Sequence, residues 1–207
     1  MTEVRKTRQR RANGEESRRR ILDAAAEIAG ERGYDGTSIA QVSERCGLPA
    51  SSIYWHFRDK DELIAAVIER SFTSWLGAFT LPADGTRLTL EGFTEVAVQV
   101  GKTLLATPDF LRLGLMLALA RRPEEPTARR KFLEVREIAL RRVESAFAAS
   151  APWLTEDSVH LVALYALAAV DGFFVAKEIG GDDVDLHRLL ALHARAVFDL
   201  VDRDRPS

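Results

Sequence analysis

The fold of this chain is decided by residues 37–57, which read TSIAQVSERCGLPASSIYWHF. Ser38 and Gln41 form a capping box at the start of a helix, and Thr37 offers a neighbouring N-cap. Gly47 supplies the permissive backbone that ends this helix and turns the chain sharply. The stretch therefore predicts two short helices joined at a glycine turn, which is the pattern of a helix-turn-helix.

The second predicted helix has an inward face and an outward face. At about 100° per residue, Ala50, Ile53 and Phe57 fall on one side and pack inward. Trp55 falls on the opposite side, next to Tyr54 and two serines. An exposed Trp beside a Tyr is costly unless a partner covers it. Because the second helix of this motif lies in the major groove, duplex DNA is the expected partner.

The remaining sequence predicts helices separated by loops, without strand alternation. An amphipathic helix over residues 17–29, with Asn13 and Glu16 as its N-terminal cap, is expected to stop at Gly33. Asp59 and Glu62 form another capping pair. Further helices are predicted over residues 62–79, 90–106, 108–121, 127–149, 155–179 and 184–201. The expected fold is all-α.

Charge is unevenly distributed along the chain. Residues 1–20 contain eight Lys or Arg and three Glu, a net charge of +5. Because the whole chain has a net charge of −2, the other residues sum to −7. The basic run from Arg5 to Arg11 has two interpretations, a solvated flexible tail or an arm that contacts phosphates or the minor groove. Arg18, Arg19 and Arg20 are better placed for phosphate contact, since the predicted helix fixes them near the groove.

Composition indicates an intracellular protein. The 207 residues suffice for one large or two small domains. The single Cys46 excludes an intramolecular disulfide and is expected to pack in the core. The Arg-rich start is not followed by the apolar segment of a secretion signal. We therefore expect a cytoplasmic protein.

Several separate stretches of the sequence resemble one family, the tetracycline-repressor (TetR) family of bacterial regulators. The matching blocks are residues 21–25, Gly33-Tyr34, residues 37–40, Gly47-Leu48, residues 53–57 and residues 60–63. The resemblance implies a three-helix DNA-binding head followed by a helical domain that binds an effector and dimerises. The expected division is a basic flexible arm over residues 1–16, the head over 17–60, and the effector and dimerisation domain over 61–207.

The resemblance also implies which residues meet DNA. Thr37 and Ser38 would touch phosphates, and His56 and Lys60 would hold the backbone. The residues expected to face the groove are Ala50, Ser51, Ser52, Tyr54 and Trp55. Three of these five side chains are small, so we expect arginines elsewhere or DNA shape to supply part of the sequence preference.

Residues 161–170 are ten consecutive apolar residues, a pattern typical of a helix buried on every side. The run is short for a membrane span. A second subunit is the simplest source of burial, so we expect a homodimer formed by the last two helices, as the resemblance also implies. Two recognition helices about 34–36 Å apart then read a palindromic operator.

The middle helices are expected to hold a small, largely apolar effector. The residues expected to line its pocket are Trp75, Phe110, Met116, Arg136, Tyr165 and Asp171. Other aromatic candidates include Phe79, Phe93, Phe132 and Phe173, with His160 as a polar anchor. For each residue alone, a place in the core is the commoner outcome. Asp171 lies inside an apolar helix, so its carboxylate needs a hydrogen-bonding or charged partner. We expect this partner to be a Tyr, an Arg or a backbone group across the dimer rather than a ligand.

Two other classes of function are alternatives to a ligand-responsive repressor. An enzyme is disfavoured because the four histidines do not pair with carboxylates at metal-ligand spacing and no phosphate loop or nucleophile motif occurs. We expect no cofactor and no metal. An architectural DNA-binding protein, in which the C-terminal part only dimerises, remains the alternative.

Overall fold

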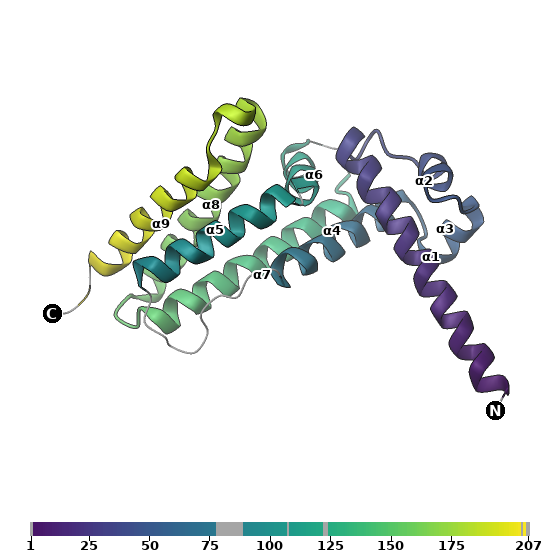
Figure 1. Ribbon diagram of the computed structural model, residues 1–207, viewed down its shortest axis with the longest axis horizontal. Coiled ribbons are helices and arrows are strands. Elements are labelled where there is room, and N and C mark those ends of the chain that lie inside the picture. Colours follow the sequence, from purple (N-terminus) through teal and green to yellow (C-terminus); the bar gives the residue numbers. More distant parts are fainter. Residues whose placement is uncertain (1, 78–88, 107, 122–123, 204, 206–207) are drawn as a thin grey trace. The chain divides into compact units, whose positions relative to one another are not determined.

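A computed structural model describes residues 2–77, 89–106, 108–121, 124–203 and 205 (Figure 1). Within these ranges the chain forms nine α-helices and one 3₁₀ turn and contains no strand, so the predicted all-α fold is confirmed. The helices are α1 (Thr2–Arg32), α2 (Ile39–Cys46), α3 (Ala50–His56), α4 (Lys60–Gly77), α5 (Leu90–Ala106), α6 (Pro108–Leu119), α7 (Thr127–Ser150), α8 (Glu156–Gly180) and α9 (Leu186–Arg203), with η1 (Gly181–Asp183) between the last two.

The helices group into two compact units. The first unit comprises residues 1–72 and 109–134, and the second comprises residues 73–108 and 135–207. We expected the head to end near residue 60, but by compactness the first unit continues along α4 to Phe72 and also takes in α6 and the start of α7. The expected loop over residues 81–85, and Phe79, lie outside the described residues.

Helix α1 differs from the expectation at its start. It begins at Thr2 rather than near residue 17, so residues 2–16 are helical where a flexible arm was expected. Asn13 is therefore an interior residue rather than a cap, and its carbonyl accepts a hydrogen bond from the Ser17 hydroxyl at 2.9 Å. The physical reason is composition, because more than half of this segment is Arg, Lys, Gln and Glu, which are good helix formers, and it contains no proline.

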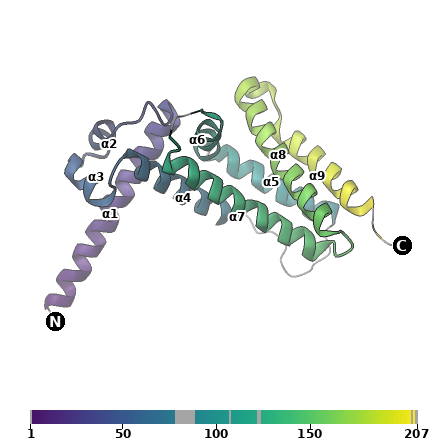
Figure 2. The ribbon, with the colours of Figure 1, turned by 180° about the vertical axis from the view of Figure 1, so that it is seen from behind.

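The first three helices and the start of α4 share one core, seen beside one another in Figure 2. From α1 it takes Ile21 and Ile28, from α2 Val42, from α3 Ile53, and from α4 Leu63. All five are at most 2% exposed. Cys46 is also buried here, as predicted. Burying several large aliphatic side chains at about 1.5–3 kcal/mol each holds α3 in a fixed orientation.

Helices α6 and α7 meet at a glycine within the first unit. A Cβ added at Gly114 would lie 2.0 Å from Cε2 of Phe132. Phe132 is itself buried and packs against Phe110, with the ring centroids 6.0 Å apart. The close approach of α6 to this ring therefore depends on the absence of a side chain at position 114.

Gly114→Ala is expected to destabilise the protein by about 1–3 kcal/mol, because the buried ring has no room to move away. The gain in helix propensity, about 0.5–1 kcal/mol, is too small to offset the clash. Urea denaturation measures the change. Gly92→Ala is the matched control, since its Cβ would meet only Thr89 Oγ1 at 3.4 Å; equal stabilities of the two variants would contradict the prediction.

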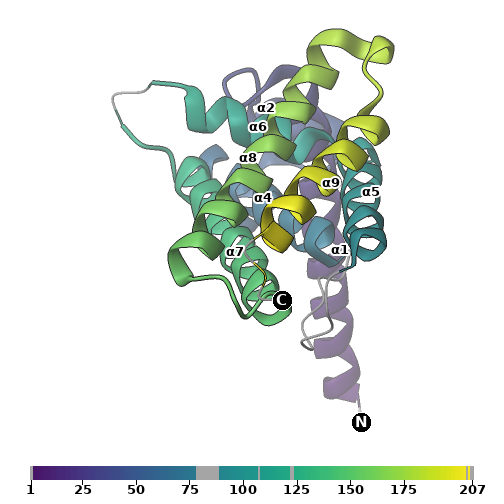
Figure 3. The ribbon, with the colours of Figure 1, turned by 90° about the vertical axis from the view of Figure 1, so that its left-hand side faces the viewer.

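In the second unit, α9 packs against both α5 and α8 (Figure 3). Gly101 of α5 allows the close approach, since a Cβ there would lie 2.3 Å from Leu190 Cδ1 of α9. Phe147, Val159 and Val197 form a buried cluster where α7, α8 and α9 meet. His193 of α9 is buried against α8, with its ring 5.5 Å from that of Tyr165 and 5.4 Å from that of Phe173.

The apolar helix α8 is largely uncovered in the single chain. The segment Glu156–Asp183 is long and apolar enough to cross a membrane, but only 17% of its most apolar window is buried. A core helix of a soluble protein passes the same test of length and composition. Side chains such as Leu161 (65% exposed) and Ile179 (82% exposed) therefore require a covering partner or solvent contact.

Candidate nucleic-acid interface

The two short helices are fixed by their ends, as predicted. The Ser38 side chain caps α2 by accepting a hydrogen bond from the Gln41 backbone N–H at 3.3 Å. Gly47 ends α2 with φ of +65°, a left-handed conformation that favours glycine. The Arg20 guanidinium of α1 donates to the Cys46 carbonyl at 2.6 Å, so a free carbonyl at the end of α2 is satisfied.

The Thr37 side chain forms a hydrogen bond inside the head that the sequence did not predict. It is 2% exposed, and its hydroxyl donates to the Gly33 carbonyl at 2.8 Å. The side chain therefore fixes the turn between α1 and α2, and its predicted contact with a phosphate stays a prediction. Sequence reasoning could not separate Thr37 from Ser38, because both are suitable caps; the structure assigns the cap to Ser38, which is exposed.

Helix α3 presents a polar and aromatic surface. Tyr54 is 56% and Trp55 76% exposed, and Ser51 is exposed as well. Ala50 and Ser52 are half-buried. On the opposite side of the helix Ile53 and Phe57 are buried. The predicted groove-facing residues thus share one short helix whose inward face is anchored in the core.

Three further predicted residues surround α3. The Arg18 guanidinium lies 5.3 Å from the centre of the Phe57 ring. His56 stacks edge-on against Trp55, with centroids 4.5 Å apart, and partial burial together with the Arg18 charge lowers the pKa of His56. His56 is therefore a neutral hydrogen-bonding group at physiological pH rather than a fixed cation.

Lys60 has an intramolecular role beside any contact with DNA. Its Nζ donates to the Tyr34 carbonyl at 3.1 Å and lies 4.5 Å from the centre of the Tyr34 ring. The ammonium therefore ties the start of α4 to the turn between α1 and α2. A phosphate contact by Lys60 requires the side chain to share its donors between DNA and this turn.

Asp61 is a structural residue whose role sequence reasoning missed. Its carboxylate accepts from the backbone N–H groups of Thr127 at 2.5 Å and Ala128 at 3.0 Å, and from the Tyr34 hydroxyl at 3.1 Å. One carboxylate thus caps α7 and holds the turn that precedes α2. No spacing signal could reveal this, because the capped helix begins 66 residues away along the chain.

The residues predicted to line an effector pocket fall in both compact units. Phe110 and Met116 belong to the first, and Trp75, Arg136 and Tyr165 to the second, together with Asp171. Phe110 and Trp75 are buried, whereas Met116 and Tyr165 are about half exposed. Met116 packs on the head, since a Cβ added at Gly33 would lie 2.9 Å from its Cε.

The structure brings Arg136 and Asp171 together. The Arg136 guanidinium donates to Asp171 Oδ2 at 2.6 Å, which supplies an Arg partner from α7 of the same chain rather than across a dimer. Asp171 Oδ1 is buried without a hydrogen-bond partner among the described residues. Burial raises the pKa of Asp171, while the neighbouring guanidinium opposes that rise.

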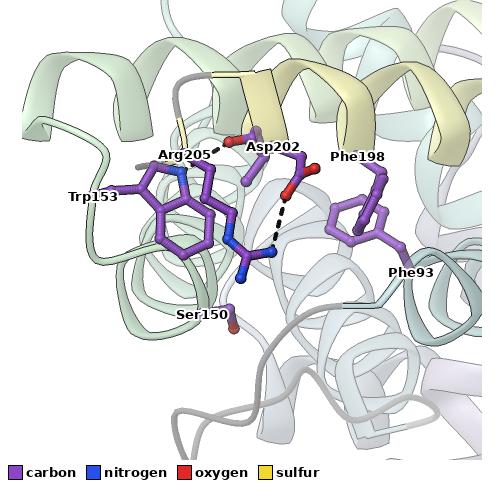
Figure 4. A pocket seen from close by; sticks show the side chains of 7 residues that line it. Phe93, Ser150, Trp153, Phe198, Asp202 and Arg205 are labelled. Carbon is purple, nitrogen blue, oxygen red and sulfur yellow. Dashed lines mark hydrogen bonds and ion pairs between the residues drawn. The ribbon is translucent and has the colours of Figure 1, made fainter. Parts of the chain in front are cut away.

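A small cavity in the second unit was not predicted (Figure 4). Its volume is about 10 Å³, which matches one water molecule. Its aromatic lining includes Phe93, which we had proposed for the effector pocket, and Trp153, whose indole N–H donates to the Val201 carbonyl at 2.9 Å. Arg205 stacks on Trp153 and pairs with Asp202. The cavity is too small in this form for an effector.

A capped α2, a glycine turn and an exposed aromatic α3 define a helix-turn-helix DNA-binding domain. Comparison with known proteins then identifies its kind: residues 21–67 match the family described as bacterial regulatory proteins, tetR family. The likeness to the TetR family therefore lies in this N-terminal head. Its relatives are transcriptional regulators, not enzymes.

Two curated relatives and one solved structure illustrate the likeness. The transcriptional regulator AcrR of Shigella flexneri is 36% identical over 68 residues, covering 33% of this chain and 30% of that protein. A transcriptional repressor of Mycobacterium tuberculosis is 31% identical over 106 residues, covering 51% of this chain and 50% of its own length. The regulator FadR of Bacillus subtilis, solved with stearoyl-CoA, is 17% identical with a TM-score of 0.68, covering 86% of this chain and 96% of that one.

These matches differ in what they establish. The chain spans about a third to a half of the length of these curated relatives. The likeness to FadR extends over most of the chain but concerns the fold alone. The head is therefore the part of the chain in which sequence similarity to the family is found.

Proposed function

We propose that this chain is a transcriptional repressor that binds a palindromic operator as a homodimer in the cytoplasm and is released by a small, largely apolar effector. The observation that carries the proposal is the exposed pair Tyr54 and Trp55 on α3, held by a capped and tightly packed scaffold. Large aromatic side chains exposed on a recognition helix are explained by contact with base methyl groups and sugars.

Dimerisation through α8 and α9 is supported by their uncovered apolar side chains. These are Leu161, Leu164, Tyr165, Val175 and Ile179 on α8, and Leu192 and Leu200 on α9. A protein surface fits better than lipid, because Asp171 in the middle of α8 forms an ion pair with Arg136 of α7. The partner proposed is a second copy of the chain, since one symmetric interface covers the same face on both subunits.

Leu161→Glu is expected to weaken the dimer at least tenfold, because each interface then contains two uncompensated carboxylates. Sedimentation equilibrium over a concentration series measures the dissociation constant. Leu119→Glu is the matched control, since Leu119 is 80% exposed and belongs to α6, which is not one of the two helices proposed to form the interface. If both variants dimerise as tightly as the wild type, the interface lies elsewhere.

The effector is proposed to be apolar because most of the predicted lining residues are aromatic or aliphatic. Release follows if the effector binds best when the two heads stand at a spacing that does not match the operator. Helix α4 is the proposed moving element, since it continues from the head into the second unit. The stearoyl-CoA bound to FadR of Bacillus subtilis supports a ligand with a long apolar part.

The experiment that tests the proposal is fluorescence anisotropy on duplexes from upstream of the chain's own and neighbouring genes, over a salt series. Nanomolar preference for one palindromic segment over a scrambled duplex is the expected result. Weak binding that is equal on both duplexes and falls steeply with salt would contradict specific recognition.

An architectural protein is the second candidate, and an effector screen separates it from a repressor. Acyl-CoA esters, free fatty acids and lipophilic cations are titrated into the preformed DNA complex. Dissociation by one of these classes supports the repressor, whereas binding that none of them alters supports a dimer that only organises DNA.

A further inference from the structure

The N-terminal half of α1 extends beyond the core of the head. The described side chains of α1 begin at Ala12; those from Ala12 to Arg20 are exposed or half-buried, and the first buried one is Ile21. Figure 1 shows this half of the helix continuing past α2 and α3. A helical segment that extends past a core gains stability from packing only if a partner lies along it.

The extension leaves the head beside the recognition helix. A Cβ added at Gly14 would lie 3.8 Å from the Trp55 ring, and Arg18, one turn further along, stacks on Phe57. Both contacts are made to the C-terminal end of α3 or to the residue that follows it. The axis of α1 therefore passes the exposed aromatic end of α3 and continues outward from it.

The length of the extension suits the dimensions of DNA. Thr2 precedes Gly14 by twelve residues, which at 1.5 Å per residue corresponds to about 18 Å of helix. This is about half of the roughly 34 Å turn of the duplex. A helical segment that runs outward from Gly14, beside α3 in the major groove, can therefore reach the phosphates that flank the half-site.

The charge of the extension is complementary to such a partner. Residues 2–11 contain five basic residues, Arg5, Lys6, Arg8, Arg10 and Arg11, and one acidic residue, Glu3. Nearer the core, Glu16 is held by Arg19 at 2.7 Å and does not neutralise the distal segment. The rest of the protein beyond residue 20 is net negative, so the positive potential is concentrated at this end.

We propose that residues 2–12 of α1 are a second DNA-binding element, which binds the phosphates of the duplex flanking the half-site that α3 reads. The inference rests on the proposed function, because it requires α3 to place the head in the major groove. Contacts to phosphates add affinity and lengthen the footprint without adding base preference. Of the two interpretations of the basic run, a flexible tail or an arm that contacts DNA, the proposal adopts the second, with the arm formed by a helix.

The test compares operator duplexes with and without flanking DNA. One duplex ends at the outer edges of the palindrome, and the other carries about one helical turn of unrelated sequence on each side. The variant changes Arg5, Lys6, Arg8, Arg10 and Arg11 to Gln, which preserves helix propensity. The control changes five exposed basic residues elsewhere to Gln, namely Lys102, Arg130, Arg141, Arg142 and Arg203.

The wild type and the control are expected to bind the flanked duplex at least tenfold more tightly than the short one, and the variant is expected to lose this gain. The dependence of log K on log salt concentration should become shallower by about 0.9 for each phosphate contact removed. Circular dichroism verifies that helix content is retained.

Two failures are distinguishable. If the variant keeps the gain from the flanks and the wild-type salt dependence, the inference is overturned and the proposed function stands. If the wild-type protein binds no operator duplex more tightly than a scrambled duplex, the proposed function itself fails. If the variant loses helix content but still binds the flanked duplex more tightly than the short one, the proposal is also overturned. Tighter binding would then not require a helical extension.

Discussion

Tyr54→Ala is expected to weaken specific operator binding by a factor of about 30 to 10⁴, because a direct contact in the groove contributes about 1–3 kcal/mol and each dimer contains two. Tyr54 is 56% exposed and lies next to Trp55 on α3. The inward residue Ile53 keeps its place, so the scaffold of the head is retained. The free energy of unfolding should change by less than about 0.5 kcal/mol, as at other exposed sites.

Fluorescence anisotropy on operator and scrambled duplexes measures the effect. Tyr54→Phe separates the hydroxyl from the ring: recovery of wild-type affinity assigns the contact to the ring face. Leu133→Ala, which truncates an exposed side chain of α7, is the control and should bind normally. If Tyr54→Ala reduces operator and scrambled binding equally, Tyr54 contributes only to non-specific contact and another side chain reads the bases.

The parts of the fold that the sequence predicted depend on local interactions. The cap at Ser38 and the turn at Gly47 use residues within a few positions of each other, and both were found where expected. Likewise, α5 was predicted at the bounds observed, and Thr155 caps α8. Such features are visible in a single sequence because capping and turn chemistry need only neighbouring residues.

The parts that were missed depend on distant segments. Thr37 is a residue type that often caps helices, yet Ser38 caps α2 instead. The Thr37 hydroxyl donates a hydrogen bond to the Gly33 carbonyl. Asp61 looks like an ordinary acidic residue in the first turn of a helix, but two of its hydrogen bonds lead to α7. The sequence predicts the start of α1 near residue 17 because a run of charged residues is typical of a flexible tail; the helix begins at Thr2 because the same residues are good helix formers.

Arg136→Ala is expected to cost about 3–5 kcal/mol at neutral pH, because it leaves the Asp171 carboxylate buried without its partner. In the wild type the two side chains are only 26% and 22% exposed and lie 2.6 Å apart. The other carboxylate oxygen of Asp171 already lacks a hydrogen-bond partner among the described residues. Among the residues that the structure describes, Arg136 is therefore the one group that compensates the Asp171 charge.

The pH dependence identifies the cause. Burial raises the pKa of Asp171 and Arg136 opposes that rise, so removal of Arg136 leaves the pKa higher still. A carboxyl with a raised pKa in the folded state costs stability above its unfolded pKa of about 4 and costs nothing below it. The deficit of Arg136→Ala, measured by urea denaturation, should be full at pH 7 and shrink towards pH 4.

Two further variants complete this test. Arg136→Met combined with Asp171→Leu should recover most of the stability, since an apolar pair can replace a buried ion pair. Arg141→Ala is the matched control on the same helix, because its pair with Glu137 is exposed and should contribute no more than about 0.5 kcal/mol. A deficit that is independent of pH would instead assign the loss to the packing of the Arg136 side chain. In that case Asp171 would not need a charged partner, and its uncompensated oxygen would become the group to examine for contact with an effector.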